Sequence, residues 1–380
     1  MDTKDINPDL ASRDVTVPDT TMTSLEAEML TTASKPDATG TVPETAVEAS
    51  PENGIGTPAP QKKAQTPLRD SLRRLRRDKR AMASIMVILF FIIIPIIGPP
   101  IYSHIGGIYH SDLNGTLGPQ VYHDPFHQEL TQQDQGPSAM YWLGTDSIGR
   151  DMLARLMNGM LISLIVALTV EIFNVILGLT FGILAGYFGG TIDQFLARFT
   201  DVMFAFPGLL FAILLTGIFG AQADVVFSRI PLIGANGDAR LLLVSLALTI
   251  ASWPFMARLA RGQTLQLKEQ QFIEAARTAG TSNFKIIIRH IIPNLFSIIV
   301  VAATLDISNT IVGEAGLSFL GLGVQPPGSS LGLMISDGSA VLDSHPWEVL
   351  LPSLVLAAIV LAFSFLGDGL RDAFDPRSKD

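Results

Sequence analysis

The sequence predicts an all-α membrane protein with six transmembrane helices and a disordered N-terminal tail. Of the 380 residues, 48% are hydrophobic and only 16% are charged, a balance that suits lipid-facing helices and not a soluble domain. Six apolar stretches account for this excess, and each is near the roughly 20 residues that cross a bilayer core. They lie at 82–103, 161–185, 201–220, 240–260, 294–315 and 349–367.

Residues 1–66 form the predicted disordered, acidic tail. They are rich in Thr, Pro, Ala, Asp and Glu and lack apolar periodicity, so they bury too little apolar surface to offset the entropy of ordering them. Eleven acids and five bases in this segment supply −6 of the formal net charge of −9. The acidity of the chain therefore says nothing about a substrate. A dispensable solvated tail and a docking or regulatory tail both stay open.

Residues 67–81 are predicted to form a basic amphipathic helix at the membrane interface. Leu68, Leu72 and Leu75 recur at i, i+4 and i+7 and share one helical face. Arginines and lysines occupy most of the remaining surface and can bind anionic lipid headgroups. The apolar stretch that follows at once favours membrane lipid over nucleic acid as the contact of this helix.

The placement of Lys and Arg predicts the orientation in the membrane. With the N-terminus inside, the outer loops carry only Arg150, Arg155, Arg229 and Arg240, and the inner segments carry the other twenty-two bases. Six spans return the chain to the side on which it started. We therefore expect a multi-pass protein of the cytoplasmic (inner) membrane with both termini in the cytoplasm.

The loop at 263–293, between the fourth and fifth spans, then faces the cytoplasm. Residues 263–279 contain neither Pro nor Gly and are predicted to be helical, and Gly280 can follow in the positive-φ conformation that ends a helix. Thr281 or Ser282 can cap a second helix that closes at Pro293. Its apolar face is predicted from Phe284, Ile287, Ile288 and Ile291. Such a pair of helices fits either a groove on a soluble partner or the membrane surface.

The acid, the alanines and the glycine of this loop have a distinctive spacing. Glu274, Ala275 and Ala276 are followed after three residues by Gly280, and nine further residues lead to the segment His290–Pro293. This spacing resembles the EAA loop of bacterial ABC import permeases, with His290 and Ile292 where Ile and Leu are usual. The resemblance implies coupling helices that insert into a cleft on each ATPase subunit. It assigns ATPase coupling to Glu274, Ala275, Ala276, Gly280 and Pro293.

Three further stretches resemble one subunit type within that family. Residues 142–164, 313–327 and 366–377 are similar to the C-type permease subunit of dipeptide and oligopeptide importers. After a double proline this chain has Ser330-Leu331-Gly332, where the family often has Ser-Trp-Gly. The resemblance covers roughly residues 80–377. It implies the six-helix fold of type I ABC importer permeases over residues 82–377.

The resemblance implies a permease subunit that forms half of a translocation path for di- or oligopeptides, with nickel as the alternative cargo. The implied partners are a homologous second permease subunit, two ABC ATPase subunits and an extracytoplasmic substrate-binding protein. An enzyme is not expected, because no lysine follows a glycine and none precedes Ser or Thr, as the core of a P-loop requires. No cofactor is expected on this chain, and ATP and Mg²⁺ are expected on the ATPase partners.

Polar residues inside the predicted spans are candidates for lining the translocation path. Asp306, Asn309, Thr310 and Glu314 fall along one helical side of the fifth span. An ionised carboxylate in hydrocarbon costs ~2.5–3.5 kcal/mol on insertion scales, so such residues normally face the bundle interior or water. The candidate pore-lining residues are Asp306, Asn309, Thr310 and, in the second span, Glu171. Glu314 is placed at the external mouth, and interhelical hydrogen bonding is the alternative role for this group.

Glycines and prolines in the spans predict how the helices pack and bend. Gly178, Gly182 and Gly186 repeat a G-x-x-x-G face that lets another helix approach closely. Prolines within predicted spans free a carbonyl and bend the helix; they are Pro95, Pro207 and Pro254.

No metal site is predicted. The chain has no cysteine, and the histidines of the first outer loop are irregularly spaced: His104, His110, His123 and His127. His290 and His345 have no partner that the sequence reveals. Two functions of other classes stay open: a secondary transporter that uses Glu171 and Asp306 as ion carriers, and a membrane sensor whose acidic tail is the output.

Overall fold

The computed structural model describes residues 67–111, 123–227 and 239–375, and the predicted tail lies outside these ranges. Within them all regular secondary structure is helical, apart from one isolated bridge between Thr145 and Asp151. Six helices are long and apolar enough to cross a membrane, which confirms the predicted number of spans. They are α2 (Lys79–Ser111), α3 (Met152–Phe188), α5 (Gly208–Phe227), α6 (Leu241–Lys268), α9 (Ile292–Phe319) and α11 (Trp347–Phe374).

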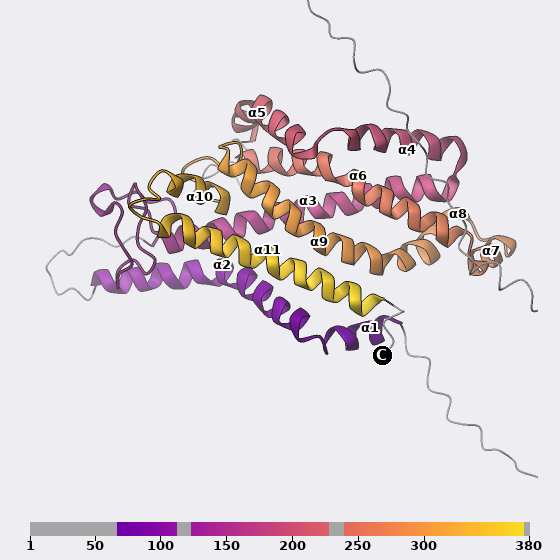
Figure 1. Cartoon of the computed structure of the whole chain (residues 1–380), viewed down its shortest axis with the longest axis horizontal. Helices are drawn as coiled ribbons and strands as arrows, with labels where there is room; N and C mark the ends of the chain where they lie inside the picture. The colour runs from indigo at the N-terminus through magenta and orange to yellow at the C-terminus, as the bar shows by residue number, and fades with distance from the viewer. Residues whose placement is uncertain (1–66, 112–122, 228–238, 376–380) are drawn as a thin grey trace, which may run out of the picture. The chain divides into compact units, whose positions relative to one another are not determined.

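Shorter helices connect the long ones. They are α1 (Pro67–Leu75), α4 (Gly190–Ala205), α7 (Gln271–Thr278), α8 (Asn283–Ile286) and α10 (Leu331–Ser339), with a 3₁₀ turn at Leu130–Gln132 and a π-helical turn at Ile287–Ile291. In Figure 1, α7 and α8 lie at one end of the helix bundle, and α10 lies at the other end with the loop 123–151. The bundle therefore has two distinct polar ends.

Among the described residues, the two largest of five apolar clusters lie one toward each end of the bundle. Toward the α10 end, α3 packs on α2, α9 and α10 around residues such as Met157, Ile311 and Leu331. Toward the α7 end, α3 and α6 pack on the start of α9 around Met256 and Ile291. The apolar faces directed away from these cores are exposed, as the lipid-facing sides of membrane helices are.

The predicted helix at 67–81 is divided in the structure. Helix α1 ends at Leu75, and α2 begins at Lys79 after a short turn in which the Asp78 carboxylate accepts a hydrogen bond from the Arg80 N–H at 2.8 Å. Leu75 is buried against Ala373 of α11, while Leu72 is exposed. The apolar face of α1 thus reaches the bundle through its last turn.

The predicted third span begins too early. Residues 190–205 form a separate helix, α4, and the chain is extended at Phe206 before α5 starts at Gly208. A residue that precedes a proline is biased away from the α conformation, so Pro207 ends one helix and starts another. Pro95 and Pro254, by contrast, lie inside α2 and α6 as predicted.

The loop 263–293, predicted to face the cytoplasm, also differs from the prediction at both of its boundaries. The helix predicted over 263–279 is broken at Glu269 and Gln270, where the backbone becomes extended between α6 and α7. The second helix does not close at Pro293, which lies in the first turn of α9. The preceding π-helical turn has a wider backbone that accommodates the proline ring, so α8, this turn and α9 run as one span over Asn283–Phe319.

Candidate functional site

The turn after α7 is fixed by a glycine, as the sequence predicts. Gly280 has φ +75°, and its N–H donates to the carbonyl of Arg277 at 2.9 Å. The N–H of Thr281 donates to the carbonyl of Ala276 at 3.1 Å. These two bonds form a Schellman motif, which satisfies the last carbonyls of the helix and turns the chain sharply.

Helix α7 is anchored to the bundle by one fully buried side chain. Ile273 has no exposed surface and packs in the same core as Ile286 and Ile291. The apolar face predicted for the second helix is therefore partly wrong, because Phe284 is 73% exposed and Ile288 is 49% exposed. Ile286 is buried in their place, since the packing of α8 on the bundle decides which of its apolar residues turn inward.

The opposite face of α7 is open to solvent. Glu274 and Ala275 are exposed, Ala276 is half-buried against the core around Ile273, and Gly280 is exposed at the end of the helix. Pro293 is exposed but belongs to the start of α9. The loop thus presents Glu274, Ala275 and Gly280 together on a short helix whose other side is fixed in the bundle.

A tyrosine at the end of α3 connects α7 and α8, a contact that the sequence analysis missed. The Tyr187 hydroxyl donates to Oδ1 of Asn283 at 2.9 Å, and the guanidinium carbon of Arg277 lies 5.2 Å from the centre of the Tyr187 ring. A Tyr at the end of an apolar stretch is a weak sequence signal, because its partners follow about 90 residues later. Both helices of the loop therefore contact the second span directly.

The glycine face of α3 lies against α6. A Cβ atom built on Gly178 would lie 2.5 Å from the Met256 Cβ, and one on Gly182 would lie 2.5 Å from the Ala257 carbonyl oxygen. Gly186 makes a similar approach to Thr264. These distances leave no room for any side chain, so the small residues allow the two helices to touch backbone to backbone.

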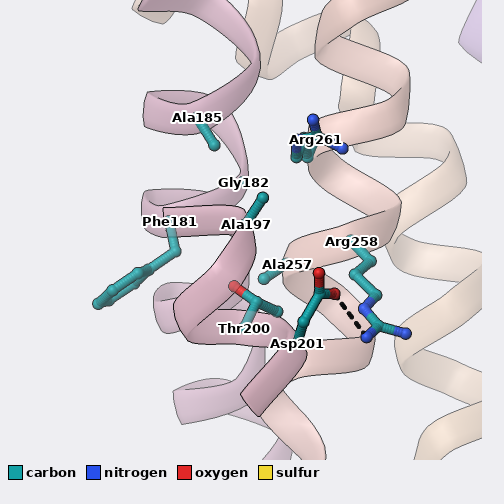
Figure 2. Close-up of a pocket in the computed structure, with 9 residues that line it drawn as sticks. All are labelled: Phe181, Gly182, Ala185, Ala197, Thr200, Asp201, Ala257, Arg258 and Arg261. Atoms are coloured by element: carbon teal, nitrogen blue, oxygen red, sulfur yellow. Dashed lines mark hydrogen bonds and ion pairs between the residues drawn. The ribbon is translucent and has the colours of Figure 1, made fainter. Parts of the chain in front are cut away.

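Ion pairs hold α4 to α6 near the α7 end. Figure 2 shows Asp201 of α4 facing Arg258 of α6, at 2.8 Å, beside a cavity of about 250 Å³. The guanidinium of Arg261 donates to both carboxylate oxygens of Asp193 and holds the pKa of that carboxyl below its ordinary value. A carboxylate paired bidentately with arginine is one of the stronger charge contacts, so this pair joins α4 to α6.

Polar side chains meet in the middle of the bundle where α3, α6 and α9 come together. The Asn174 amide donates to the Ser252 hydroxyl at 2.8 Å and to the Asp306 carboxylate at 3.2 Å. Glu171, one turn before Asn174, is buried beside the same Asp306. Two of the predicted pore-lining carboxyls, Glu171 and Asp306, are therefore neighbours.

Asp306 and Asn309 line a cavity of about 710 Å³. Its other walls come from α6, from the start of α9 and from the end of α11, including Phe255, Gln263 and Arg371. Glu171 and Thr310 are buried and are not among the residues that line it. Of the four candidate pore-lining residues, Asp306 and Asn309 therefore line the cavity, whereas Glu171 and Thr310 are buried away from it.

Glu314 is sealed inside the protein. Its carboxylate accepts hydrogen bonds from the Ser163 hydroxyl at 2.6 Å and the Ser318 hydroxyl at 2.7 Å, and it has no exposed surface. Glu314 therefore does not line an open mouth in this structure. The serine of α3 explains the difference, because it supplies a hydroxyl that the pattern within one span cannot reveal.

A buried charge network joins the loop before α3 to α10, and the sequence analysis named its arginines only as outer-loop bases. Asp146 pairs with Arg150 at 2.7 Å and with Arg155 at 2.5 Å. Asp337 of α10 pairs with the same two arginines, at 3.1 and 2.8 Å. The i, i+4 spacing of Asp146 and Arg150 is a sequence signal for the first pair. Asp337 could not be found this way, because it lies on a distant helix.

Two family models match this chain. The model of the binding-protein-dependent transport system inner membrane component matches residues 178–380. The model of the N-terminal transmembrane domain of oligopeptide transport permease C matches residues 66–137.

Several relatives align with most of the chain. The dipeptide transport system permease protein DppC of Bacillus subtilis (strain 168) is 36% identical over 81% of this chain and 85% of its own length. The oligopeptide transport system permease protein OppC of Haemophilus influenzae is 34% identical over 82% of this chain and 88% of its own length. The glutathione transport system permease protein GsiD of Pectobacterium atrosepticum is 41% identical over 65% of this chain and 76% of its own length.

Proposed function

We propose the function of this chain from one premise: it belongs to the binding-protein-dependent inner membrane components, the permease subunits of ABC importers, and to their C type. Its relatives are named for the transport of dipeptides, oligopeptides and glutathione, all of them peptides. We infer that this chain forms half of a translocation path for di- or oligopeptides across the inner membrane. The other half is a homologous second permease subunit.

Two ABC ATPase subunits and an extracytoplasmic substrate-binding protein complete the proposed importer. The sequence has no P-loop, so ATP and Mg²⁺ are held by the ATPase subunits and not by this chain. The substrate-binding protein delivers the peptide to the α10 end of the bundle. No covalent chemistry is assigned to this chain, and its role is to change the side on which the path is open.

The observation that carries this proposal is the construction of α7. A short helix with an exposed Glu274 and Ala275 ends in a tight turn at Gly280, while Ile273 and Ala276 hold its other side to α3, α6 and α9. A surface helix that is fixed on one side and open on the other suits docking into a cleft of a soluble partner. We assign ATPase coupling to Glu274, Ala275, Ala276 and Gly280. We place Pro293 in α9, the helix to which α7 transmits the movement of the ATPase subunits.

We propose that Asp306 and Asn309 contribute to the wall of the path. Both line the cavity between α6, α9 and α11, where a second permease can close the open side. Glu171 and Thr310 act behind this wall, and Glu171 does so through its contact with Asp306. Gly178, Gly182 and Gly186 set the close approach of α3 to α6 on which the wall depends.

The orientation follows from the bases at the two ends of the bundle. The α7 end carries Lys268, Arg277, Lys285 and Arg289 in or beside the loop, together with the basic residues of α1. Because positive residues remain on the cytoplasmic side, we place α7 and both termini in the cytoplasm and α10 outside. In this position the cations of α1 contact anionic lipid headgroups.

One observation supports a second candidate function, an ion-coupled secondary transporter. Glu171 and Asp306 are neighbouring carboxyls inside the membrane, an arrangement that proton carriers also use. Nickel remains the alternative cargo within the ABC family. Ion-coupled transport and nickel import each predict an uptake result that differs from the one expected for peptide import.

The test compares two acids of the same loop. Glu274→Ala and Glu269→Ala both remove an exposed carboxylate, but only Glu274 lies in α7. In the complete importer reconstituted into liposomes, we expect Glu274→Ala to lower ATP-driven uptake of a labelled dipeptide by at least ~10-fold, equivalent to about 1.4 kcal/mol of coupling. The amount of ATPase subunits that co-purify with the Glu274→Ala chain should fall as well. Glu269→Ala, the matched control, transports normally.

Normal uptake by the Glu274→Ala complex would remove the coupling assignment. Uptake of radioactive nickel in place of the dipeptide by the unmodified complex would replace the peptide with the metal as cargo. ATP-independent uptake driven by a proton gradient would favour the secondary transporter.

A further inference from the structure

Three potential metal ligands meet at the α10 end of the bundle. Asp134 belongs to the loop before α3, whereas Glu348 lies in the first turn of α11 and His345 just before that helix. One donor atom of each residue lies within 4.8 Å of the other two, and the His345 Nδ1 lies 3.9 Å from the Asp134 Oδ1. The sequence gives no sign of this cluster, because its members come from opposite halves of the chain.

The carboxylates of this cluster are poorly satisfied by the surrounding protein. Glu348 is only 2% exposed, and its Oε1 has no hydrogen-bond partner among the described residues. The Asp134 Oδ1 is likewise buried and without such a partner. A buried carboxylate oxygen without a donor costs free energy, and two that face one another repel. A cation between them removes both penalties.

The neighbouring arginines direct their ion pairs to other carboxylates, although Nη1 of Arg150 and Nε of Arg155 have no hydrogen-bond partner among the described residues. Arg155 donates to Asp146 and Asp337, and Arg150 pairs with the same two carboxylates. Within the described part of the chain, neither guanidinium pairs with Asp134 or Glu348. A cation bound between the three ligands would supply a positive charge in direct contact with both carboxylates.

The backbone holds all three ligands in place. His345 and Glu348 are three residues apart, and the Glu348 N–H donates to the His345 carbonyl at 3.2 Å, so both side chains leave the same turn. The Asp134 N–H donates to the Asp146 carbonyl at 3.0 Å, and Asp134 has a left-handed φ of +52°. A left-handed conformation is uncommon for a residue other than glycine and is often found at functional sites.

We propose that Asp134, His345 and Glu348 bind one divalent transition-metal ion, for which Zn²⁺ is the best match. One imidazole and two carboxylates are a ligand set that zinc sites use, whereas Mg²⁺ and Ca²⁺ prefer oxygen ligands alone. Zinc–ligand bonds of ~2.0–2.2 Å place neighbouring ligand atoms about 3.3 Å apart, so small side-chain movements close the present spacing. The two carboxylates neutralise the charge of the ion, and a fourth position stays available to water.

Such an ion would fasten the loop 123–151 to the first turn of α11. The charge network of Asp146 and Asp337 already joins that loop to α10, and the metal adds a second attachment on the neighbouring helix. None of the three ligands lines the cavity of Asp306 and Asn309, and none belongs to α7. Failure of the metal site would leave the proposed transport function untouched.

The experiment counts zinc in the purified importer complex after treatment with a chelator and dialysis against ZnCl₂. His345→Ala and Glu348→Gln each remove a ligand, and Asp343→Asn is the matched control, because Asp343 is an exposed acid of the same turn. We expect each ligand variant to hold one zinc ion fewer per copy of this chain than the unmodified complex. By calorimetric titration with ZnCl₂, the affinity of this site falls by at least ~10-fold in both variants. The control binds as the unmodified complex does.

A second readout separates metal binding from folding. Zinc should raise the Tm of the unmodified complex, because it binds the folded state, and this rise should disappear in His345→Ala. His345 is partly exposed, so its replacement is the milder change. Equal zinc content in unmodified and His345→Ala complexes would overturn the proposal. So would a Tm of the unmodified complex that does not respond to zinc, in which case Asp134 and Glu348 share a proton.

Discussion

At the scale of single residues, Arg155 shows how one buried charge can fix a loop. Its side chain is 1% exposed, and its guanidinium contacts both Asp146 in the loop and Asp337 on α10. Desolvating an arginine is expensive, and here two carboxylates compensate for it. A second arginine, Arg150, shares the same partners, so each carboxylate is matched by a guanidinium.

Replacement of Arg155 by methionine should destabilise the protein strongly. The change keeps the apolar stem but leaves one negative charge uncompensated in the network, at a cost of about 3 kcal/mol, the lower end of the range for broken buried pairs because Arg150 remains. The measurement is the Tm of the purified complex in detergent. Arg258→Met is the control, since Arg258 is 43% exposed and its pair with Asp201 contributes little. Equal shifts of Tm in the two variants would contradict the role given to burial.

At the scale of elements, the contact between α3 and α6 depends on glycine. Gly182 faces the backbone of α6 so closely that even a methyl group has no space, whereas a Cβ atom built on Gly262, in α6 itself, would meet no described atom within 4 Å. Substitution by alanine therefore has opposite consequences at the two positions. One glycine permits contact, and the other merely weakens its own helix.

Gly182→Ala should push α3 away from α6 and lower stability by about 1–3 kcal/mol, because the methyl group meets backbone atoms that cannot rotate aside. Gly262→Ala should be neutral or stabilise the helix by up to ~1 kcal/mol. Thermal unfolding of the two purified variants tests this difference. If both variants unfold at the temperature of the unmodified protein, the close contact between α3 and α6 does not contribute to stability.

The elements also show what a sequence can and cannot predict. The number of spans follows from apolar length alone, and the turn at Gly280 follows from a local rule for helix ends. The break at Glu269 and Gln270 could not be predicted, because those residues favour helices and the burial of Ile273 in the bundle is a tertiary contact. Tertiary packing likewise decides that Ile286 is buried and Phe284 exposed.

In the candidate site, too, local patterns could be predicted from the sequence and long-range contacts could not. Glu274 and Gly280 could be located by spacing, and Asp306 could be located as a charge within an apolar span. The burial of Glu314 by Ser163, and the cluster of Asp134 with His345 and Glu348, join residues that are distant along the chain. Such contacts have no local signature in one sequence.

At the scale of the whole molecule, the source of energy distinguishes the proposed functions. In the proposed ABC importer Asp306 is part of the wall of the path, Glu171 lies behind it, and the proton gradient plays no part. A protonophore added while ATP is held constant should therefore leave dipeptide uptake by the reconstituted importer unchanged. Replacing the P-loop lysine of the ATPase subunits should abolish it. Loss of uptake on addition of the protonophore would instead identify the carboxyl pair as an ion carrier.

The continuous span from α8 through the π-helical turn into α9 has a mechanical consequence. Asn283 and Phe319, the two ends of this span, are separated by 36 positions, which at 1.5 Å per residue is about 54 Å. A tilt of roughly 10° about one end would carry the other end through about 9 Å, more than the diameter of a water molecule. A rod of this length lets a small rotation on one side of the membrane become a wide opening on the other, with no residue along it needing to unfold.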